Sequence, residues 1–137
     1  MSKIVLVSGG FTLLHKGHIR LFHEASFHGG VVVALNSDAW VKRKHPALCF
    51  PSWADRAEVL ASVRHISQVI AFEDADDTAC DAIQRVHPDY FANGGDRNQA
   101  NPQEHDLCRR LGVIELFDVG GGKVASSRDL MFHVERP

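Results

Sequence analysis

The chain has 137 residues, of which 45% are hydrophobic and 23% are charged, and its formal net charge is −2 at neutral pH. These values are typical of one globular domain with its own core, so residues 1–137 are interpreted as a single domain. The small negative charge argues against a nucleic-acid partner, and no apolar run approaches the roughly 20 residues that a membrane span needs. We therefore expect no nucleic-acid partner and no membrane partner.

The first predicted elements are a strand, a turn and a helix. Residues 3–8 contain a continuous apolar run, typical of a buried strand, and Gly9 and Gly10 follow it. The stretch from Gly17 to about His28 has the apolar spacing of a helix. Because the first N–H groups of a helix lack partners within it and its dipole is positive there, this corner favours an anion.

Two histidines, His15 and His18, stand at the start of this helix. Residues at this spacing share one helix face, where two imidazoles suit holding a phosphate and stabilising negative charge during its transfer. Two other interpretations stay open from the residues alone. The histidines are solvated or structural, or they form a zinc pair, although no further ligands follow at zinc-site spacing.

The rest of the chain alternates short apolar runs with amphipathic stretches. The predicted strands are 31–35, 68–72, 90–93 and 113–117, and the predicted helices are 52–64, 77–87, 102–111 and a last one from about Ser126. Residues 39–52 are basic, contain two prolines and are expected to be irregular. The acidic run 73–77 is interpreted as a solvated turn and helix start, with a metal site as the alternative.

This alternation of strands and helices predicts an α/β fold: a single Rossmann-like, doubly wound domain with a five-stranded parallel sheet. In such sheets ligands bind beyond the carboxyl ends of the strands, where the strand order changes direction. The polar segments of this chain each follow a predicted strand, at residues 9–18, 36–44, 93–97 and 119–127. We therefore expect these segments to meet at one edge of the sheet and form one site.

The first polar segment, Gly-Gly-Phe-Thr-Leu-Leu-His-Lys-Gly-His at residues 9–18, resembles the signature of the HxGH-motif nucleotidyltransferase superfamily. That superfamily includes cytidylyltransferases and small adenylyltransferases. Its members typically carry Gly-x-Phe-Asp-x-x-His-x-Gly-His, and Thr12 stands here where the aspartate is usual. The resemblance implies that His15 and His18 are catalytic. It also implies a set of nucleotide-binding residues, namely Gly9, Gly10, Phe11 and Thr12.

Residues 34–44 resemble the second-strand region of small sugar-phosphate nucleotidyltransferases. Among these, the heptose-1-phosphate adenylyltransferases and the glycerol-3-phosphate cytidylyltransferases are nearest. The resemblance implies that Lys42 and Lys44 reach the triphosphate and the acceptor phosphate, with Lys44 as the catalytic lysine, and that Asp38 belongs to the acceptor site. A solvated basic turn is the alternative.

The predicted helix 52–64 resembles the family's helix that carries an arginine in contact with acceptor or phosphate. Arg56 would hold that role, and Arg64 matches another basic position of the cytidylyltransferase branch. The planar fork of donors on an arginine suits phosphate. Either side chain could instead pair with Glu58, with Asp55 or with a neighbouring subunit.

Residues 93–96, Asn-Gly-Gly-Asp, resemble a Lys-Gly-Gly-Asp segment whose glycines approach the nucleobase and ribose. The resemblance implies that Asn93, Gly95 and Asp96 bind nucleotide, although Asn93 replaces the usual lysine. A double glycine before an aspartate is also a common turn.

Ser126 and Ser127 stand where the family shows a Ser/Thr-rich motif that holds the β- and γ-phosphates. An ordinary helix cap is the alternative interpretation of these serines. The arginine that precedes this motif in glycerol-3-phosphate cytidylyltransferases is a glycine here, so the choice between CTP and ATP stays open.

Together the motifs imply an enzyme that moves a CMP or AMP group from CTP or ATP to the phosphate of a small sugar- or polyol-phosphate acceptor. The acceptor would attack the α-phosphorus in line and pyrophosphate would leave. A Mg²⁺ ion is expected to bridge the phosphates, held largely by water and phosphate oxygens, so no protein metal ligand is predicted. The resemblance also implies a homodimer. A nucleotide-binding module without turnover, such as a sensor, is the alternative.

Three cysteines, Cys49, Cys80 and Cys108, are odd in number and widely spaced, and they form no zinc pattern. Reduced thiols that pack in a cytosolic protein are expected. The sequence begins almost directly with a strand, so no signal peptide is expected and the predicted location is cytoplasmic.

Overall fold

The computed structural model describes residues 2–94 and 101–121. Within them five strands form one sheet in the order β3-β2-β1-β4-β5, with every neighbouring pair parallel. The strands are β1 (Ile4–Gly9), β2 (Gly30–Leu35), β3 (Ile66–Ile70), β4 (Tyr90–Gly94) and β5 (Ile114–Val119). The helices are α1 (Lys16–Ala25), α2 (Asp38–Lys44), α3 (Trp53–Ala61), α4 (Cys80–Val86) and α5 (Pro102–Leu111). The predicted Rossmann-like α/β fold is confirmed.

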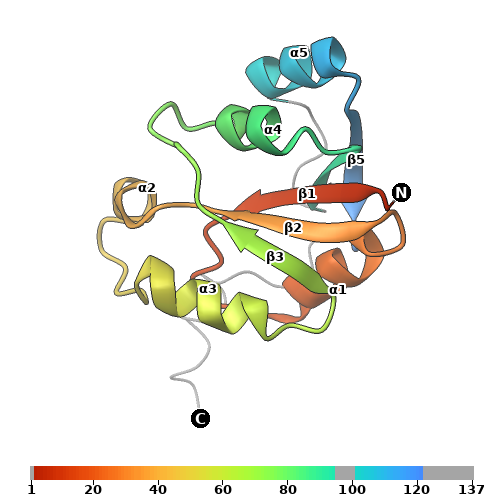
Figure 1. The fold of residues 1–137 in the computed structure, drawn as a ribbon. Coiled ribbons are helices and arrows are strands. Elements are labelled where there is room, and N and C mark those ends of the chain that lie inside the picture. The colour runs from red at the N-terminus through yellow and green to blue at the C-terminus, as the bar shows by residue number, and fades with distance from the viewer. Residues whose placement is uncertain (1, 95–100, 122–137) are drawn as a thin grey trace.

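Helices cover both faces of the sheet, with α1 and α3 on one face and α4 and α5 on the other (Figure 1). Successive residues of a strand point to opposite faces, so β1 contributes to two cores. Val5 lies in the core beneath α1 and α3, together with Phe22. Leu6, the next residue, lies in the core beneath α4 and α5, together with Ile83. Burial on both faces explains why β1 and β2 are continuous apolar runs rather than alternating ones.

The strand order changes direction at β1. The chain passes from β1 to β2 and β3 on one side, and then returns to the other side of β1 with β4 and β5. At such a point the connections that follow β1 and β4 diverge to opposite faces, which leaves a crevice beyond their carboxyl ends. Figure 1 shows α2 at this same end of the sheet, just beyond β2.

Several predicted boundaries were wrong, among them the following three. Residues 38–44 form the helix α2 instead of an irregular segment, because the Ser37 hydroxyl accepts a hydrogen bond from the Trp40 N–H at 3.1 Å and caps it. The strand expected at 68–72 is β3, two residues earlier, and Phe72 is instead buried beyond the sheet ladder. The helix expected from residue 77 starts at Cys80, because Asp77 has a left-handed φ of 62°. The helix expected from Ser126 lies outside the described residues.

The three cysteines are free thiols with different surroundings: Cys49 is exposed, Cys80 is half-buried and Cys108 is buried. Burial, followed by the charges of Glu115 and Glu104, raises the pKa of Cys108 to about 12. A thiol that stays protonated behaves as a small apolar packing group, as expected. Among the described residues, no helix has the length and apolar character needed to cross a membrane.

Candidate active site

A cleft of about 320 Å³ opens at the change in strand order, beyond the carboxyl ends of β1, β2 and β4. Its floor is the glycine turn after β1, its walls are Trp40 of α2 and the loop that precedes α4, and its far side is Asn93 of β4. The residues that line it include Gly9, Gly10, Phe11, His18, Asn36, Trp40, Phe72, Asp77, Thr78, Asn93, Gly94 and Glu104. Three of the four polar segments expected to meet here supply lining residues.

The two motif histidines form a reciprocal cap on α1. The Nδ1 atom of His15 accepts a hydrogen bond from the Gly17 N–H at 3.1 Å, and the Nδ1 atom of His18 accepts one from the His15 N–H at 3.3 Å. The imidazole rings stack with their centroids 3.8 Å apart and an angle of 22° between their planes. The edge of Phe11 packs against His18, with ring centroids 5.0 Å apart. The short motif therefore fixes both rings by local contacts.

These caps determine the chemistry that the histidines can perform. Because a backbone N–H can only donate, each Nδ1 atom must carry a lone pair, and the ring proton of each neutral imidazole lies on Nε2. Two neutral imidazoles with their Nε2–H groups as donors stand where the helix dipole is positive. His18 lines the cleft, so this arrangement suits phosphate oxygens as acceptors.

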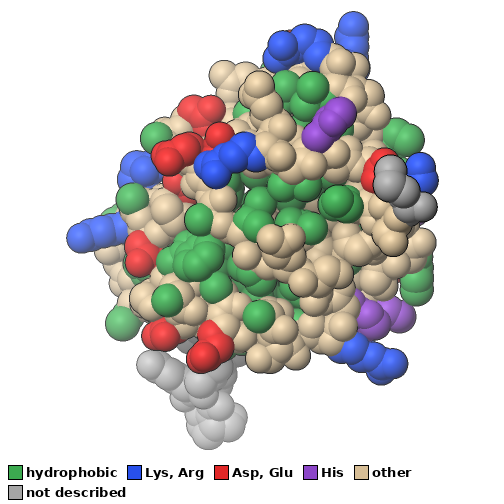
Figure 2. All heavy atoms as spheres, viewed as in Figure 1, with side chains coloured by type: hydrophobic (Ala, Val, Ile, Leu, Met, Phe, Trp, Pro, Cys, Tyr) green, Lys and Arg blue, Asp and Glu red, His purple; other side chains and the backbone are tan. Residues whose placement is uncertain are grey.

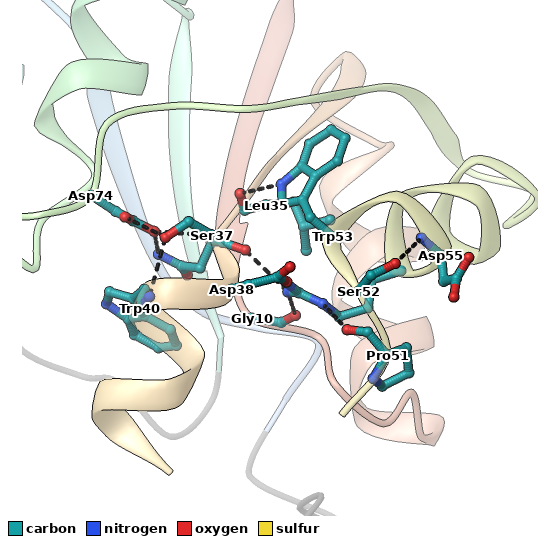
Figure 3. A network of polar contacts seen from close by, with 12 residues as sticks. Gly10, Leu35, Ser37, Asp38, Trp40, Pro51, Ser52, Trp53, Asp55 and Asp74 are labelled. Atoms are coloured by element: carbon teal, nitrogen blue, oxygen red, sulfur yellow. Dashed lines mark hydrogen bonds and ion pairs between the residues drawn. The ribbon is translucent and has the colours of Figure 1, made fainter. Parts of the chain in front are cut away.

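The junction between β2 and α2 is held by a buried carboxylate, Asp74 (Figure 3). Its oxygens accept hydrogen bonds from the Asn36 side chain at 3.1 Å, from the Ser37 N–H at 2.7 Å and from the Ser37 hydroxyl at 2.8 Å. Asp74 is only 5% exposed. The interpretation of the acidic run as a solvated turn is therefore wrong for this residue, whose charge is balanced by hydrogen bonds and not by water.

Arg56 of α3 reaches the same junction and is buried. Its guanidinium donates to the carbonyls of Gly10 at 2.7 Å and Asn36 at 3.0 Å. It also donates to the carbonyl of Pro51 at 3.0 Å and to the carboxylate of Asp38 at 2.6 Å. Arg56 thus joins the turn after β1 to the start of α2, and these four hydrogen bonds are all made to groups of the protein itself. This geometry gives it a positioning role.

Two cations of α2 lie at the mouth of the cleft. Lys44 is 3.3 Å from the Asp77 carboxylate, and its Nζ lies 5.9 Å from the centre of the Trp40 ring. Arg43 is 2.9 Å from the other oxygen of the same carboxylate. Figure 2 shows acidic and basic side chains side by side over α2 and the loop before α4. Neither cation lines the cleft itself, but both contact Asp77, which does. Lys42 is exposed on the same short helix and has no such contact among the ion pairs of the described residues.

The structure brings most of the expected residues together, but not all of them. Arg64 is exposed just beyond α3 and before β3, at the amino-terminal end of the sheet, so it lies away from the cleft. The reason is that α3 runs back along the sheet and carries its last residues to the opposite edge. Thr12 is half-buried in the loop between β1 and α1. The other expected residues, Gly95, Asp96, Ser126 and Ser127, lie outside the described part of the chain.

Several cleft residues were missed by the sequence analysis. Phe72, Thr78 and Glu104 line the cleft, and the Glu104 carboxylate accepts a hydrogen bond from the Ala79 N–H at 2.9 Å. Phe72 was assigned to a strand, and Thr78 and Glu104 were assigned to helices. Only the strand order reveals that these segments share one edge with the histidines.

The described residues contain no group of three or more His, Cys, Asp or Glu side chains arranged to hold a metal ion. The carboxylates nearest the cleft are engaged otherwise, Asp77 with two cations and Glu104 with a backbone N–H. A metal site in the acidic run, the alternative considered from the sequence, therefore finds no support in this geometry.

The parallel sheet with a cleft at its change in strand order defines a Rossmann-like α/β class of protein, and comparison with known proteins gives the family. A family model described as cytidylyltransferase-like matches residues 6–113, so the chain belongs to the cytidylyltransferase-like family. The match covers β1 through α5 and includes every described residue of the cleft.

Relatives of known name are similar over most of this chain. The bifunctional protein HldE of Syntrophotalea carbinolica is 34% identical over 123 residues, which are 88% of this chain and 25% of that protein. The bifunctional protein HldE of Hyphomonas neptunium is 42% identical over 112 residues, which are 80% of this chain and 23% of that protein. The chain therefore spans about a quarter of the length of these relatives.

A solved structure is similar in fold. The lipopolysaccharide core biosynthesis protein from Thermoplasma volcanium matches with a TM-score of 0.70 at 20% sequence identity, over 85% of this chain and 94% of that one. At this identity the likeness concerns the architecture of the sheet and its helices.

Proposed function

We propose that this chain transfers a nucleotidyl group from CTP or ATP to the phosphate of a small sugar- or polyol-phosphate acceptor and releases pyrophosphate. The observation that carries the proposal is the stacked histidine pair at the start of α1, whose Nδ1 atoms accept backbone hydrogen bonds and whose His18 ring lines the cleft. The resemblance of residues 34–44 to sugar-phosphate nucleotidyltransferases supports the class of acceptor.

The reaction is a displacement at phosphorus. A phosphate oxygen of the acceptor attacks the α-phosphorus of the triphosphate, and the bond from that phosphorus to the pyrophosphate oxygen breaks. Negative charge moves onto the leaving pyrophosphate, where His15 and His18 donate hydrogen bonds without changing their own protonation. Neither a covalent intermediate nor a general base is needed, because the attacking phosphate is already an anion.

The remaining residues position the two substrates. Lys44 neutralises the acceptor phosphate, and Gly9 and Gly10 let the nucleotide approach the backbone closely. Asn93 is buried, lines the cleft and donates its side-chain N–H to the Leu116 carbonyl at 3.3 Å. Its proposed role is to contact the nucleoside. Arg56 acts through the loops that it joins. A Mg²⁺ ion would neutralise the triphosphate, held by its phosphate oxygens and water.

The test is pyrophosphate release with Mg²⁺, using each of the four ribonucleoside triphosphates and a panel of acceptors: sugar 1-phosphates, glycerol 3-phosphate and related compounds. One triphosphate and one acceptor should give turnover. His18→Ala should lower kcat about 100-fold, as expected for loss of one transition-state donor. His28→Ala removes an exposed histidine after α1 and should leave kcat unchanged.

Two results would contradict the proposal. The first is an equal kcat in His18→Ala and wild type. The second is the absence of pyrophosphate release with every triphosphate and acceptor tested, while calorimetry detects tight nucleotide binding. The second result would favour the non-catalytic module. The proposal extends to a cytoplasmic homodimer, for which light scattering of the purified chain is the direct measurement.

A further inference from the structure

The mouth of the cleft holds a charge cluster of three side chains: Arg43, Lys44 and Asp77. Arg43 and Lys44 come from the last turn of α2, whereas Asp77 comes from the loop before α4, more than 30 residues further along the chain. One Asp77 oxygen is 2.9 Å from Arg43 Nη2 and the other is 3.3 Å from Lys44 Nζ. Asp77 also lines the cleft, so this carboxylate sits between the two cations at the entrance.

The Asp77 carboxylate shows where Arg43 and Lys44 hold a negatively charged group. A carboxylate and a phosphate present the same kind of acceptor oxygens to arginine and lysine donors. The point where two cations converge is where an incoming phosphate is most strongly attracted. In the structure a side chain of the protein itself occupies that point.

The backbone holds Asp77 in this place. Its φ of 62° lies in the left-handed region, which Asp and Asn tolerate better than most residues, and its N–H donates to the Asp74 carbonyl at 3.0 Å. The same Asp74 carbonyl accepts a hydrogen bond from Arg43 at 3.2 Å. Arg43 is therefore anchored by a second acceptor and would stay at the mouth of the cleft if Asp77 released it.

The ion pairs in this cluster are weak enough to exchange. The side chains of Arg43, Lys44 and Asp77 are 43%, 42% and 46% exposed, and pairs with such exposure contribute little to stability. A phosphate dianion carries more charge and more acceptor oxygens than a carboxylate. It can therefore replace Asp77 on both cations.

We propose that Asp77 is a resident anion that holds Arg43 and Lys44 at the acceptor-phosphate position until the acceptor displaces it, and that Arg43 is a second ligand of that phosphate. This inference rests on the proposed function for the identity of the acceptor. The inference concerns binding alone. No covalent bond forms or breaks, and the Asp77 side chain moves into solvent as the phosphate enters. The three residues then act as an exchange site that selects acceptors by the charge of their phosphate.

The experiment measures the binding of inorganic phosphate to the nucleotide-free protein by calorimetry at low ionic strength. Asp77→Asn keeps the shape and the tolerance for a left-handed φ but removes the competing charge, so the phosphate Kd should fall about three- to tenfold. Asp106→Asn, on the exposed face of α5, makes the same change in net charge and should leave the Kd within about twofold of wild type. Adding Arg43→Ala to Asp77→Asn should remove the gain.

An unchanged or larger Kd in Asp77→Asn would overturn the inference, and so would a gain that survives Arg43→Ala. Circular dichroism on each variant checks that the fold is intact. The outcome is separable from that of the proposed function, because phosphate binding needs no turnover. Turnover with an unaltered phosphate Kd in Asp77→Asn would leave the function standing without this inference. A lower phosphate Kd in Asp77→Asn, in a protein that never releases pyrophosphate, would leave this inference standing without the proposed function.

Discussion

The two sides of the cleft are built in different ways. The corner between β1 and α1 is made by residues close together in the sequence, since His15, Gly17 and His18 hydrogen-bond to one another within one turn of helix. The junction between β2 and α2 is made by segments far apart in the sequence, because Asp74 and Arg56 reach it from other elements. In the proposed function the first corner carries the chemistry, whereas the second positions the acceptor.

The two sides therefore differ in what holds them: contacts within one turn of helix hold the histidines, and contacts between distant segments hold the junction between β2 and α2. The histidines need only the start of α1 to hold their rings, so a local motif suffices to fix their tautomer. The junction between β2 and α2 is instead assembled from three segments, which buried hydrogen bonds to Asp74 and Arg56 hold together. Arg56 connects the two sides, because it donates both to Gly10 and to Asn36.

The largest expected effect comes from breaking this connection. Arg56→Ala leaves three carbonyls without their donor, those of Gly10, Asn36 and Pro51. We expect a loss of about 3 kcal/mol in the free energy of unfolding, measured by urea denaturation. We also expect a higher KM for the acceptor, because the start of α2 is no longer held against the turn after β1.

The matched control is Arg64→Ala, which removes an exposed arginine just beyond the same helix and should change stability by less than about 0.5 kcal/mol. Arg56→Lys should be intermediate, since an ammonium keeps the charge but cannot reach several carbonyls with one planar fork. Equal stability of Arg56→Ala and Arg64→Ala would show that the two sides of the cleft are not joined through Arg56.

The next effect separates the two roles of His15. Asn is a strong helix N-cap, so His15→Asn keeps an acceptor for the Gly17 N–H but removes the imidazole. We expect kcat to fall about 100-fold, with a melting temperature close to that of wild type. His15→Ala should lose both activity and helix stability, the latter by about 1 kcal/mol. If His15→Asn retained wild-type kcat, the imidazole would be a cap and nothing more.

The same contrast between local and distant contacts explains what the sequence could predict. The sheet, the histidine corner and the glycine turn follow from runs and motifs within ten residues, and the structure places them as expected. The buried Asp74 looked like one more acidic surface residue, because its partners Asn36 and Ser37 lie 38 and 37 residues away. Arg56 was expected to contact acceptor or phosphate because its helix resembles that of the family, and nothing in this helix predicts the carbonyls that surround it.

The smallest expected effect concerns the charge cluster at the mouth of the cleft and depends on pH. The hydrogen bond from Arg43, and then that from Lys44, lowers the pKa of Asp77 below its ordinary value of 3.8. The folded protein thus favours the ionised carboxylate, so the pairing stabilises the fold above about pH 4 and is lost as the pH falls through the lowered pKa. Wild type should melt slightly above Asp77→Asn at pH 6, and this difference should shrink as the pH falls below 3.8 and vanish once the folded and unfolded states both bind the proton. Differential scanning calorimetry at a series of pH values measures it, with Asp106→Asn as the charge-matched control. A difference that persists at the acid end would mean that it does not come from the charge of Asp77, and so not from the pairing of Asp77 with the cations of α2.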